Sequence, residues 1–416
     1  MTFSRRALLS MLPAPLLLPR RARAAGTEKR LLIVYVDGGW DTTYVFAPIF
    51  GSSSVDIDPQ GTAANVGGID FTDSAARPSV RSFFERYAGR TCLLNGLEVP
   101  SVTHLRCRRL LFTGSTQDGI DDWPTRIANN TNAPLPYLVL SGPSFSGQSP
   151  LTAVRLGERG QLADLLSGDA LTDRSDQRAE PLSTEVEQRI RQMMQERALE
   201  FAEGRDGYSK KFADAWISLQ DRVESLDQLQ SKVDLAGAVA QPYSRITDRI
   251  GPALESLAAG YSRCALIRHG GQDDRSWDTH ANNENQSNHF ETLFQDLNNL
   301  MPMLEQRTGT SGLPLSEEVV VLVVSEMART PKMNTNYGKD HWTFTSAMFI
   351  GPHVAGGRMV GGYDDELIGL PTDPVSGEPG GTEPLTVQNF GATLLALMDE
   401  DPTPHTDAAV IEAILG

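Results

Sequence analysis

Cysteines, long apolar runs and nucleotide-binding motifs are scarce or absent in this sequence of 416 residues. The three cysteines are widely spaced and form no Cys-x-x-Cys pair, which excludes a disulfide-rich scaffold and a thiolate zinc knuckle. Beyond residue 24 no apolar run approaches the length of a membrane-spanning helix, so we expect no stable membrane anchor. Neither a Walker loop nor a Gly-x-Gly-x-x-Gly motif follows a strand-like segment, so nucleotide binding has no support.

Basic residues are also in the minority. The chain holds 37 lysines and arginines against 53 aspartates and glutamates, a formal net charge of −16. Five of the arginines lie in the first 24 residues, so a mature chain without that segment is more acidic still. An acidic surface repels phosphodiester backbones, and we therefore expect no nucleic-acid partner. The bland alternative is that the acidity only keeps the protein soluble.

The N-terminal segment has the order of a cleavable leader. Residues 4–9 read Ser-Arg-Arg-Ala-Leu-Leu, an apolar run follows as far as Leu18, and Ala-Arg-Ala at 22–24 fits a cleavage site. The apolar run is too short to span a bilayer. We predict that residues 1–24 are a twin-arginine signal peptide, which implies a periplasmic or secreted protein. A Sec-type leader with chance arginines is the alternative.

Continuous apolar runs alternate with helical patterns in the rest of the chain. Residues 31–36 are apolar throughout, as expected of a parallel strand buried on both faces. Similar runs occur at 264–267, 319–324 and 346–350, and residues 289–304 repeat apolar side chains at helical spacing. This alternation predicts an α/β fold for residues 25–416, with a doubly wound, mostly parallel sheet.

A helical segment interrupts this alternation between residues 182 and 235. Thr184-Glu-Val-Glu187 fits a capping box, and it opens a first amphipathic helix that ends at the glycines 204 and 207. A second helix follows, with Phe212, Trp216 and Leu219 on one side. We predict a helical hairpin inserted into the α/β domain, as a lid or as a structural pair that covers the sheet.

Polar residues follow the apolar runs at four points. Asp37 follows the first run, Asp278 and His280 come after the second, Glu326 follows the third, and His341 precedes the fourth. Because sites in open α/β sheets form at the carboxyl ends of strands, we expect these side chains to meet. Such a mixture of carboxylates and imidazoles suits a divalent ion such as zinc, manganese or calcium. Taken singly, each has an ordinary structural explanation, such as a turn after a strand.

Four motifs in order resemble the family known as domain of unknown function 1501. They are Gly-Gly-x-Asp at 38–41, Trp-Asp-Thr-His-Ala-Asn-Asn at 277–283, Ser-Glu-x-x-Arg-Thr-Pro at 325–331 and Asp-His-Trp at 340–342. The resemblance runs from about residue 29 to residue 397. That family resembles the alkaline phosphatase and sulfatase superfamily, which implies helices on both faces of the sheet and one or two divalent metals at the strand ends.

The resemblance implies a role for each of the five residues. Asp37 matches the metal aspartate after the first strand, Asp278 and His280 match a second aspartate and histidine, and His341 matches the final histidine. Glu326 stands where the superfamily has Asp-His. Since Met327 follows it, one histidine ligand is missing, and we expect one metal, or two with one weakly held.

The nucleophile is expected at the start of the segment 103–114, which resembles the sulfatase signature helix. Arg108 takes the arginine place and His104 the nucleophile place, while a serine precedes that histidine in family members and Thr103 stands there in this chain. No Cys-x-Pro-x-Arg exists, so formylglycine chemistry is excluded. Thr103 is the candidate nucleophile, with His104 and water as alternatives, and Arg108 offsets charge on the transferred group. Thr103 as a mere helix cap is equally compatible with the sequence.

These observations together predict an exported, metal-dependent hydrolase of a phosphate or sulfate ester, with a small-molecule or glycan-linked substrate. The alternative is an exported pseudoenzyme that works as a binding or assembly module on the same fold. A serine hydrolase is set aside because the segment 142–147, Gly-Pro-Ser-Phe-Ser-Gly, lacks the second glycine of a nucleophile elbow.

Overall fold

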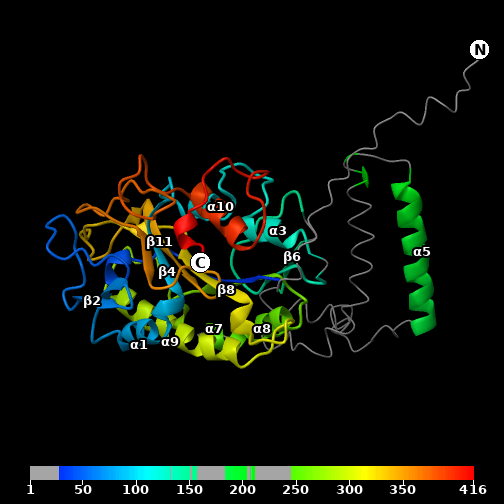
Figure 1. Cartoon of the computed structure of the whole chain (residues 1–416), viewed down its shortest axis with the longest axis horizontal. Coiled ribbons are helices and arrows are strands. Elements are labelled where there is room, and N and C mark those ends of the chain that lie inside the picture. Colours follow the sequence, from blue (N-terminus) through cyan, green and yellow to red (C-terminus); the bar gives the residue numbers. More distant parts are fainter. Residues whose placement is uncertain are drawn as a thin grey trace, which may run out of the picture.

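The centre of the molecule is an eight-stranded sheet with the order β12-β4-β11-β8-β1-β7-β5-β6 (Figure 1). The computed structural model describes residues 28–131, 133–149, 152–156, 183–203, 207, 209–210 and 245–416, so the predicted signal peptide lies outside the described residues. The strands of this sheet are β1 (Arg30–Val36), β4 (Thr91–Glu98), β5 (Tyr137–Val139), β6 (Ala153–Arg155), β7 (Cys264–His269), β8 (Val319–Ser325), β11 (Phe344–Ile350) and β12 (Arg358–Gly361). Two short pairs flank it, β2 (Thr62–Val66) with β3 (Ile69–Asp73), and β9 (Ala328–Arg329) with β10 (His341–Trp342).

The sheet is mostly parallel, as predicted. β1 pairs in parallel with β7 on one side and β8 on the other, and all three strands are apolar runs that the sequence identified. β11 differs, because it runs antiparallel to both β4 and β8. The apolar run at 346–350 is a central strand, but its direction was wrongly expected to be parallel. Burial on both faces makes a strand apolar whichever way it runs, so the pattern does not report direction.

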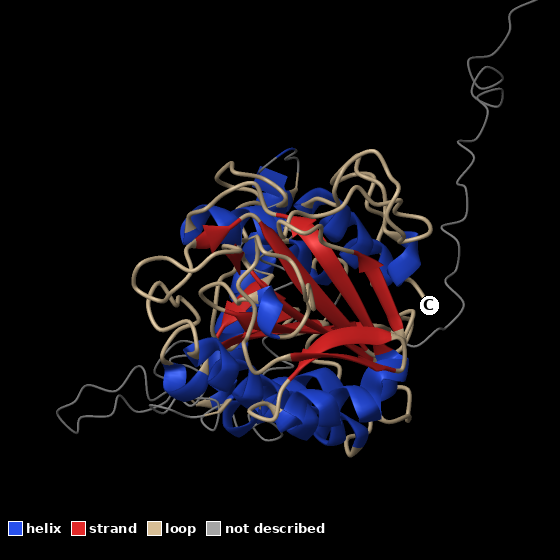
Figure 2. Ribbon diagram, turned by 90° about the vertical axis from the view of Figure 1, so that its left-hand side faces the viewer, coloured by secondary structure: helices blue, strands red, loops and turns tan. Residues whose placement is uncertain are grey.

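Helices cover both faces of the sheet, which gives the layers seen in Figure 2. One face packs on α1 (Pro78–Tyr87), α7 (Ile246–Arg249), α8 (Gly251–Ala258) and α9 (Asn285–Glu305). The other packs on α2 (His104–Thr113), α3 (Trp123–Ala128) and α10 (Val387–Leu397). Alternate residues of β1 enter the two cores, Leu32, Val34 and Val36 on the first face and Leu31, Ile33 and Tyr35 on the second. The predicted doubly wound α/β class is therefore confirmed.

Short 3-10 helices complete the described elements: η2 (Thr42–Tyr44), η3 (Ala88–Arg90), η6 (Gln272–Asp274), η7 (Leu315–Glu317) and η8 (Glu412–Ile414). The three cysteines, Cys92, Cys107 and Cys264, are buried and not bonded to one another. Among the described helices, none combines the length and the apolar character needed to cross a membrane.

The first helix of the predicted insertion is present as α5 (Thr184–Ala202), which stands apart from the sheet in Figure 1. Its N-cap is Ser183, whose side chain accepts a hydrogen bond from the Val186 amide. The predicted capping box at Thr184–Glu187 was therefore wrong by one residue, because a serine at 183 offers the same capping oxygen one position earlier. The break at 204–206 and the second helix, with Phe212 and Trp216, lie outside the described residues.

Candidate metal centre

The loop after β1 approaches the segment around Asp278 very closely. Gly38 and Gly39 have φ angles of +123° and +86°, a region that favours glycine. A β-carbon on Gly38 would lie 2.8 Å from the Asp278 amide nitrogen, and one on Gly39 would lie 2.9 Å from Met327 Cγ. The glycine pair therefore allows the ends of β1 and β8 and the loop after β7 to share one small region.

Three histidines meet in this region on the carboxylate of Asp278. His280 Nε2 and His341 Nε2 lie 2.9 Å apart, and they lie 3.1 and 3.3 Å from Asp278 Oδ1. His104, the first residue of α2, brings its Nε2 to 3.3 Å from Asp278 Oδ2. His104, Asp278 and His341 each offer a ligand atom within 4.8 Å of the others. The structure thus brings together three of the five predicted metal residues and adds His104.

The other nitrogen of each ring lies beside an oxygen. His104 Nδ1 is 2.8 Å from Glu326 Oε1, His280 Nδ1 is 2.9 Å from Asp340 Oδ1, and His341 Nδ1 is 2.6 Å from the carbonyl of Val102. These oxygens only accept hydrogen bonds, so each Nδ1 carries the proton when the ring is neutral. Each Nε2 then presents a lone pair to the common centre.

Nitrogens that converge in this way need a cation between them, either a metal ion or a proton. Without a metal, the Asp278 and Glu326 carboxylates raise the pKa of His104 to about 9, so that a proton serves there. Two acceptor nitrogens 2.9 Å apart repel each other, and His104 Nε2 is buried without a hydrogen-bond partner. In a tetrahedral zinc site with bonds near 2.0–2.1 Å, neighbouring ligand atoms are about 3.3 Å apart, close to the separations observed. His104, His341 and Asp278, whose candidate ligand atoms lie within 4.8 Å of one another, form a mixed imidazole and carboxylate set that fits zinc or a similar divalent ion. His280 lies beside this set, with its Nε2 2.9 Å from His341 Nε2.

Asp278 is held in place by Arg329, which is fully buried. The guanidinium lies 2.6 Å from Asp278 Oδ1 and also donates to the backbone carbonyls of Gly38 and Gly39. Burial alone would raise the pKa of Asp278, but the adjacent His104 ring, when protonated, and the hydrogen-bonded guanidinium of Arg329 hold this pKa well below its usual range. The carboxylate is therefore ionised and fixed before any ligand binds.

Glu326 is placed behind His104. Its side chain is fully buried, and the carboxylate accepts from the Gly38 amide at 3.1 and 3.3 Å and lies 3.3 Å from the Ser325 hydroxyl. It contacts the histidines through His104 Nδ1, at 2.8 Å from its Oε1. Glu326, predicted as a metal residue, is thus placed to orient a ligand.

Asp37, the fifth predicted metal residue, lies between two arginines. Its Oδ1 is 2.5 Å from Arg108 and 3.3 Å from the Tyr35 hydroxyl, and its Oδ2 is 3.4 Å from Arg268. Arg108 also lies 3.7 Å from Glu326 Oε1, which places this arginine pair next to the histidine cluster. The contacts of Asp37 are with these cations rather than with the histidines.

Thr103 is the N-cap residue of α2, but its side chain makes no capping hydrogen bond. The residue is exposed, and its hydroxyl lies 3.4 Å from the Ser101 hydroxyl. The hydrogen bonds of the described residues do not join Thr103 to the histidines. The choice of nucleophile therefore stays a prediction.

Several residues of the site were missed by sequence reasoning. His104 was weighed only as a nucleophile or scaffold residue, and Asp340, Arg268 and Arg329 were given no role. Asp340 and Arg329 stand inside the quoted motifs, so a signal for them existed. The Val102 carbonyl had no signal, since a backbone acceptor carries no residue-type information.

Comparison with known proteins gives a family but no curated relative. The sequence model of a family described as "Protein of unknown function (DUF1501)" matches residues 28–409. No curated protein matches.

Three solved structures are similar to this chain in the path of the backbone. A lipooligosaccharide phosphoethanolamine transferase from Neisseria meningitidis is 10% identical, with a TM-score of 0.37 and coverage of 91% of this chain and 56% of that one. An alkaline phosphatase superfamily protein from Vibrio parahaemolyticus is 8% identical, with a TM-score of 0.33 and coverage of 93% and 69%. A mutant alkaline phosphatase from the Antarctic bacterium TAB5 is 11% identical, with a TM-score of 0.35 and coverage of 90% and 100%.

Proposed function

This chain belongs to the DUF1501 family, and we propose that it is a metal-dependent hydrolase of a phosphate or sulfate ester. The observation that carries the proposal is that three histidine Nε2 atoms contact the Asp278 carboxylate, each ring fixed by an acceptor at its Nδ1. His104, His341 and Asp278 would hold the ion, and His280, beside His341, would be a further ligand. When bound, a divalent ion polarises an ester oxygen and lowers the pKa of an attacking hydroxyl or water.

The arginines beside Asp37 supply the positive charge that an anionic ester needs. Arg108 lies between Asp37 and Glu326 and donates through its Nε to the Tyr35 hydroxyl at 3.1 Å, so its planar group is fixed on one side. A guanidinium with a remaining free edge suits two oxygens of a phosphate or sulfate group. Arg108, with Arg268 beside it, would orient the ester and offset charge on the transferred group.

The attacking group is a water molecule or the Thr103 hydroxyl. Thr103 is exposed at the start of α2, one residue before His104, and no hydrogen bond holds its hydroxyl on the histidines. We favour water for this reason. A water nucleophile needs no covalent intermediate on the chain, so Thr103→Ala should leave turnover within a few fold of wild type if this choice is right.

Metal analysis of the purified protein tests the proposal, together with a panel of aryl phosphate monoesters, diesters and aryl sulfates. We expect about one divalent ion per chain and turnover of at least one substrate class. His280→Ala and His341→Ala should lose metal and turnover together, whereas the exposed His405→Ala serves as a matched control and should keep both. A protein that never retains a divalent ion would overturn the proposal.

The second candidate is a binding or assembly module that keeps a structural metal. The absence of a hydrogen bond from Thr103 to the histidines, together with the buried Met327 in place of a histidine, favours it. It predicts normal metal content with no turnover of any ester in the panel. The substrate panel therefore separates the two candidates, because metal content is the same in both.

We also propose export by the twin-arginine pathway, to the periplasm or outside the cell. The support is the arginine pair at residues 5 and 6 before a short apolar run. Changing Arg5 and Arg6 to lysine should leave unprocessed precursor in the cytoplasm, as seen by immunoblotting of cell fractions. Normal processing of that variant would point to a Sec-type leader.

A further inference from the structure

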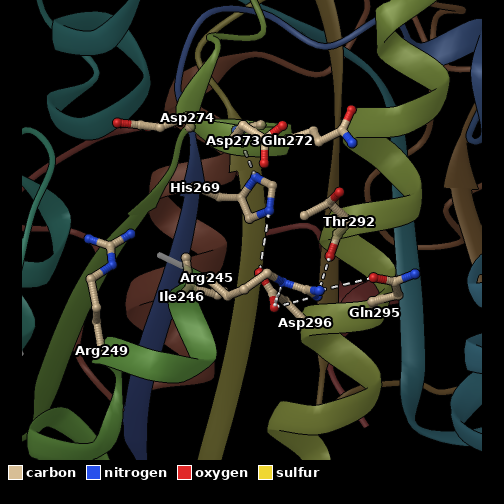
Figure 3. Close-up of a pocket in the computed structure, with 12 residues that line it drawn as sticks. Arg245, Ile246, Arg249, His269, Gln272, Asp273, Asp274, Thr292, Gln295 and Asp296 are labelled. Atoms are coloured by element: carbon tan, nitrogen blue, oxygen red, sulfur yellow. Dashed lines mark hydrogen bonds and ion pairs between the residues drawn. The ribbon is translucent and has the colours of Figure 1, made fainter. Parts of the chain in front are cut away.

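A cavity lies at the carboxyl end of β7, on the other side of that strand from Arg108. Its volume is about 200 Å³, and it is bounded by the loop 270–274, the end of α7 and the side of α9 (Figure 3). A water molecule takes up about 30 Å³ of liquid volume, so the cavity has room for a small polyatomic ligand. None of the residues assigned to the metal centre lines it.

The α9 side of this cavity is occupied by an ion pair, Arg245 with Asp296. Arg245 donates to Asp296 Oδ1 at 2.7 Å, to Gln295 Oε1 at 3.0 Å and to the carbonyl of Thr292 at 3.1 Å. Asp296 in turn lies 3.6 Å from His269 Nε2. Figure 3 shows this chain of contacts running from the loop to α9. The charges of Arg245 and Asp296 are thus paired, although Asp296 Oδ2 is buried without a hydrogen-bond partner among the described residues.

The acidic residues of the loop are also engaged. Both carboxylate oxygens of Asp274 accept hydrogen bonds from Arg268, at 2.7 and 3.0 Å. Asp273 lies 3.9 Å from Arg275. Each loop carboxylate at the cavity therefore lies beside an arginine other than Arg249, although Arg268 is shared between Asp274 and Asp37.

Arg249 is the exception among the charged groups that line the cavity. Within the part of the chain that the structure describes, its guanidinium makes no hydrogen bond and no ion pair, and its Nε is buried. Burial, followed by the positive charge of Arg268, lowers the pKa of Arg249, against the smaller opposing effects of Asp274, Asp296 and Asp248, none of which forms an ion pair with it. A partly buried cation without a counter-ion is unfavourable, and an anion in the cavity would relieve this cost.

We propose that this cavity is a second binding site, which takes a small oxyanion on Arg249: a phosphate, a sulfate or the carboxylate of a small acid. A guanidinium binds all three through paired hydrogen bonds. The inference does not depend on the reaction proposed above, because it concerns binding by residues outside the metal centre.

Titration calorimetry with inorganic phosphate, sulfate and acetate tests the site and distinguishes the three ligands. A charge-assisted hydrogen bond is worth about 1.5–3 kcal/mol, so Arg249→Gln should weaken binding of the preferred anion by about tenfold or more. Arg249→Lys should retain part of the affinity. Arg81→Gln, which removes an exposed arginine paired with Asp73, is the matched control and should change nothing.

Thr292→Trp provides a second test if Arg249→Gln does not fold. Thr292 lines the cavity from α9, and a tryptophan there would fill the space with Arg249 intact. Because phosphate can also bind at the metal centre, the titrations are repeated in a His341→Ala background, where binding that depends on Arg249 should persist. The proposal would be overturned if the wild-type protein bound none of the three anions. It would also be overturned if neither Arg249→Gln nor Thr292→Trp changed the binding.

Discussion

Glu326 carries a negative charge in a position with no access to solvent. Burial would raise the pKa of its carboxyl, but the hydrogen bonds of His104 and Tyr35 and the nearby Arg108 lower this pKa below its ordinary value. The carboxylate also accepts from the Gly38 amide. A charge kept at such a cost, directly behind a histidine whose Nε2 faces the centre, is the arrangement by which proteins orient metal-binding imidazoles.

Replacing Glu326 with glutamine tests this orienting role. The amide is isosteric and can still accept from Gly38, so we expect the fold to survive. It is a weaker acceptor for His104 Nδ1–H, so affinity for the metal should fall about 10- to 100-fold. Competition with a chromophoric chelator measures this change. Glu318→Gln is the matched control, since Glu318 is equally buried but pairs with Arg30, and it should leave metal affinity unaltered.

An unchanged metal affinity in Glu326→Gln would reject the orienting role.

The positions of the site residues in the structure also show what residue types alone could predict. Asp278, His280 and His341 were expected to meet because they flank strands, and they do lie together. Whether Glu326 faces a ligand or stands behind one depends on how α2 lies over the end of β8, and residue identity does not encode that placement. His104 was undervalued for the same reason.

At the scale of elements, α9 and the loop after β7 meet through His289. Its Nδ1 accepts a hydrogen bond from the Gln272 amide at 2.8 Å, and its ring packs on Trp277 with centroids 5.2 Å apart. Gly271 touches the same ring so closely that a β-carbon would lie 2.8 Å from His289 Nδ1. The contact therefore requires both a neutral histidine and a glycine.

The stability of the protein should depend on pH through His289. Burial, with the positive charge of His269 as a smaller contribution, lowers the pKa of His289 from 6.5 to about 4. The unfolded chain thus binds a proton more readily than the folded one. The stabilisation is present above pH 6.5 and is lost as the pH falls through about 4, with a loss of about 3 kcal/mol.

Urea unfolding at several pH values between 4 and 7 measures this effect. His289→Gln keeps an acceptor for Gln272 but cannot be protonated, so its unfolding free energy should depend less on pH in this range. Removal of the exposed His405 should alter the slope much less. A slope in His289→Gln equal to that of the wild type would contradict the assignment.

The elements themselves were predictable to differing degrees. β1, β7, β8 and α9 follow from buried apolar runs and a helical repeat, because a chain buried on two faces leaves a strong pattern. The direction of β11 could not be predicted, because a central strand buries the same side chains whether it runs parallel or antiparallel to its neighbours. The pairing of β9 with β10 brings His341 beside Arg329. Each of these strands has only two residues, which is too short to leave a periodic pattern in the sequence.

At the scale of the whole molecule, the two hydrophobic cores are formed without residues of α5. The buried clusters on either face of the sheet contain residues of β1, α1, α9, α2 and α10 but none of α5. Six large apolar residues of α5 remain 40–53% exposed, namely Val186, Ile190, Met193, Met194, Leu199 and Phe201, whereas the small Ala198 is buried. Burial of apolar surface is the main source of folding free energy, so α5 adds little to the stability of the sheet and its covering helices.

Deletion of residues 182–235, replaced by a short glycine-serine linker, tests whether this segment is an insertion. We expect the melting temperature to change by about 4 °C at most, because the two cores are untouched and loop closure depends only weakly on loop length. Metal content should stay at the wild-type level, since all four histidine-cluster residues lie outside the segment. If the segment acts as a lid, turnover of the ester substrates should change while metal content does not, and if it is only structural, both should stay. A deleted chain that no longer folds would show that the segment belongs to the core of the domain.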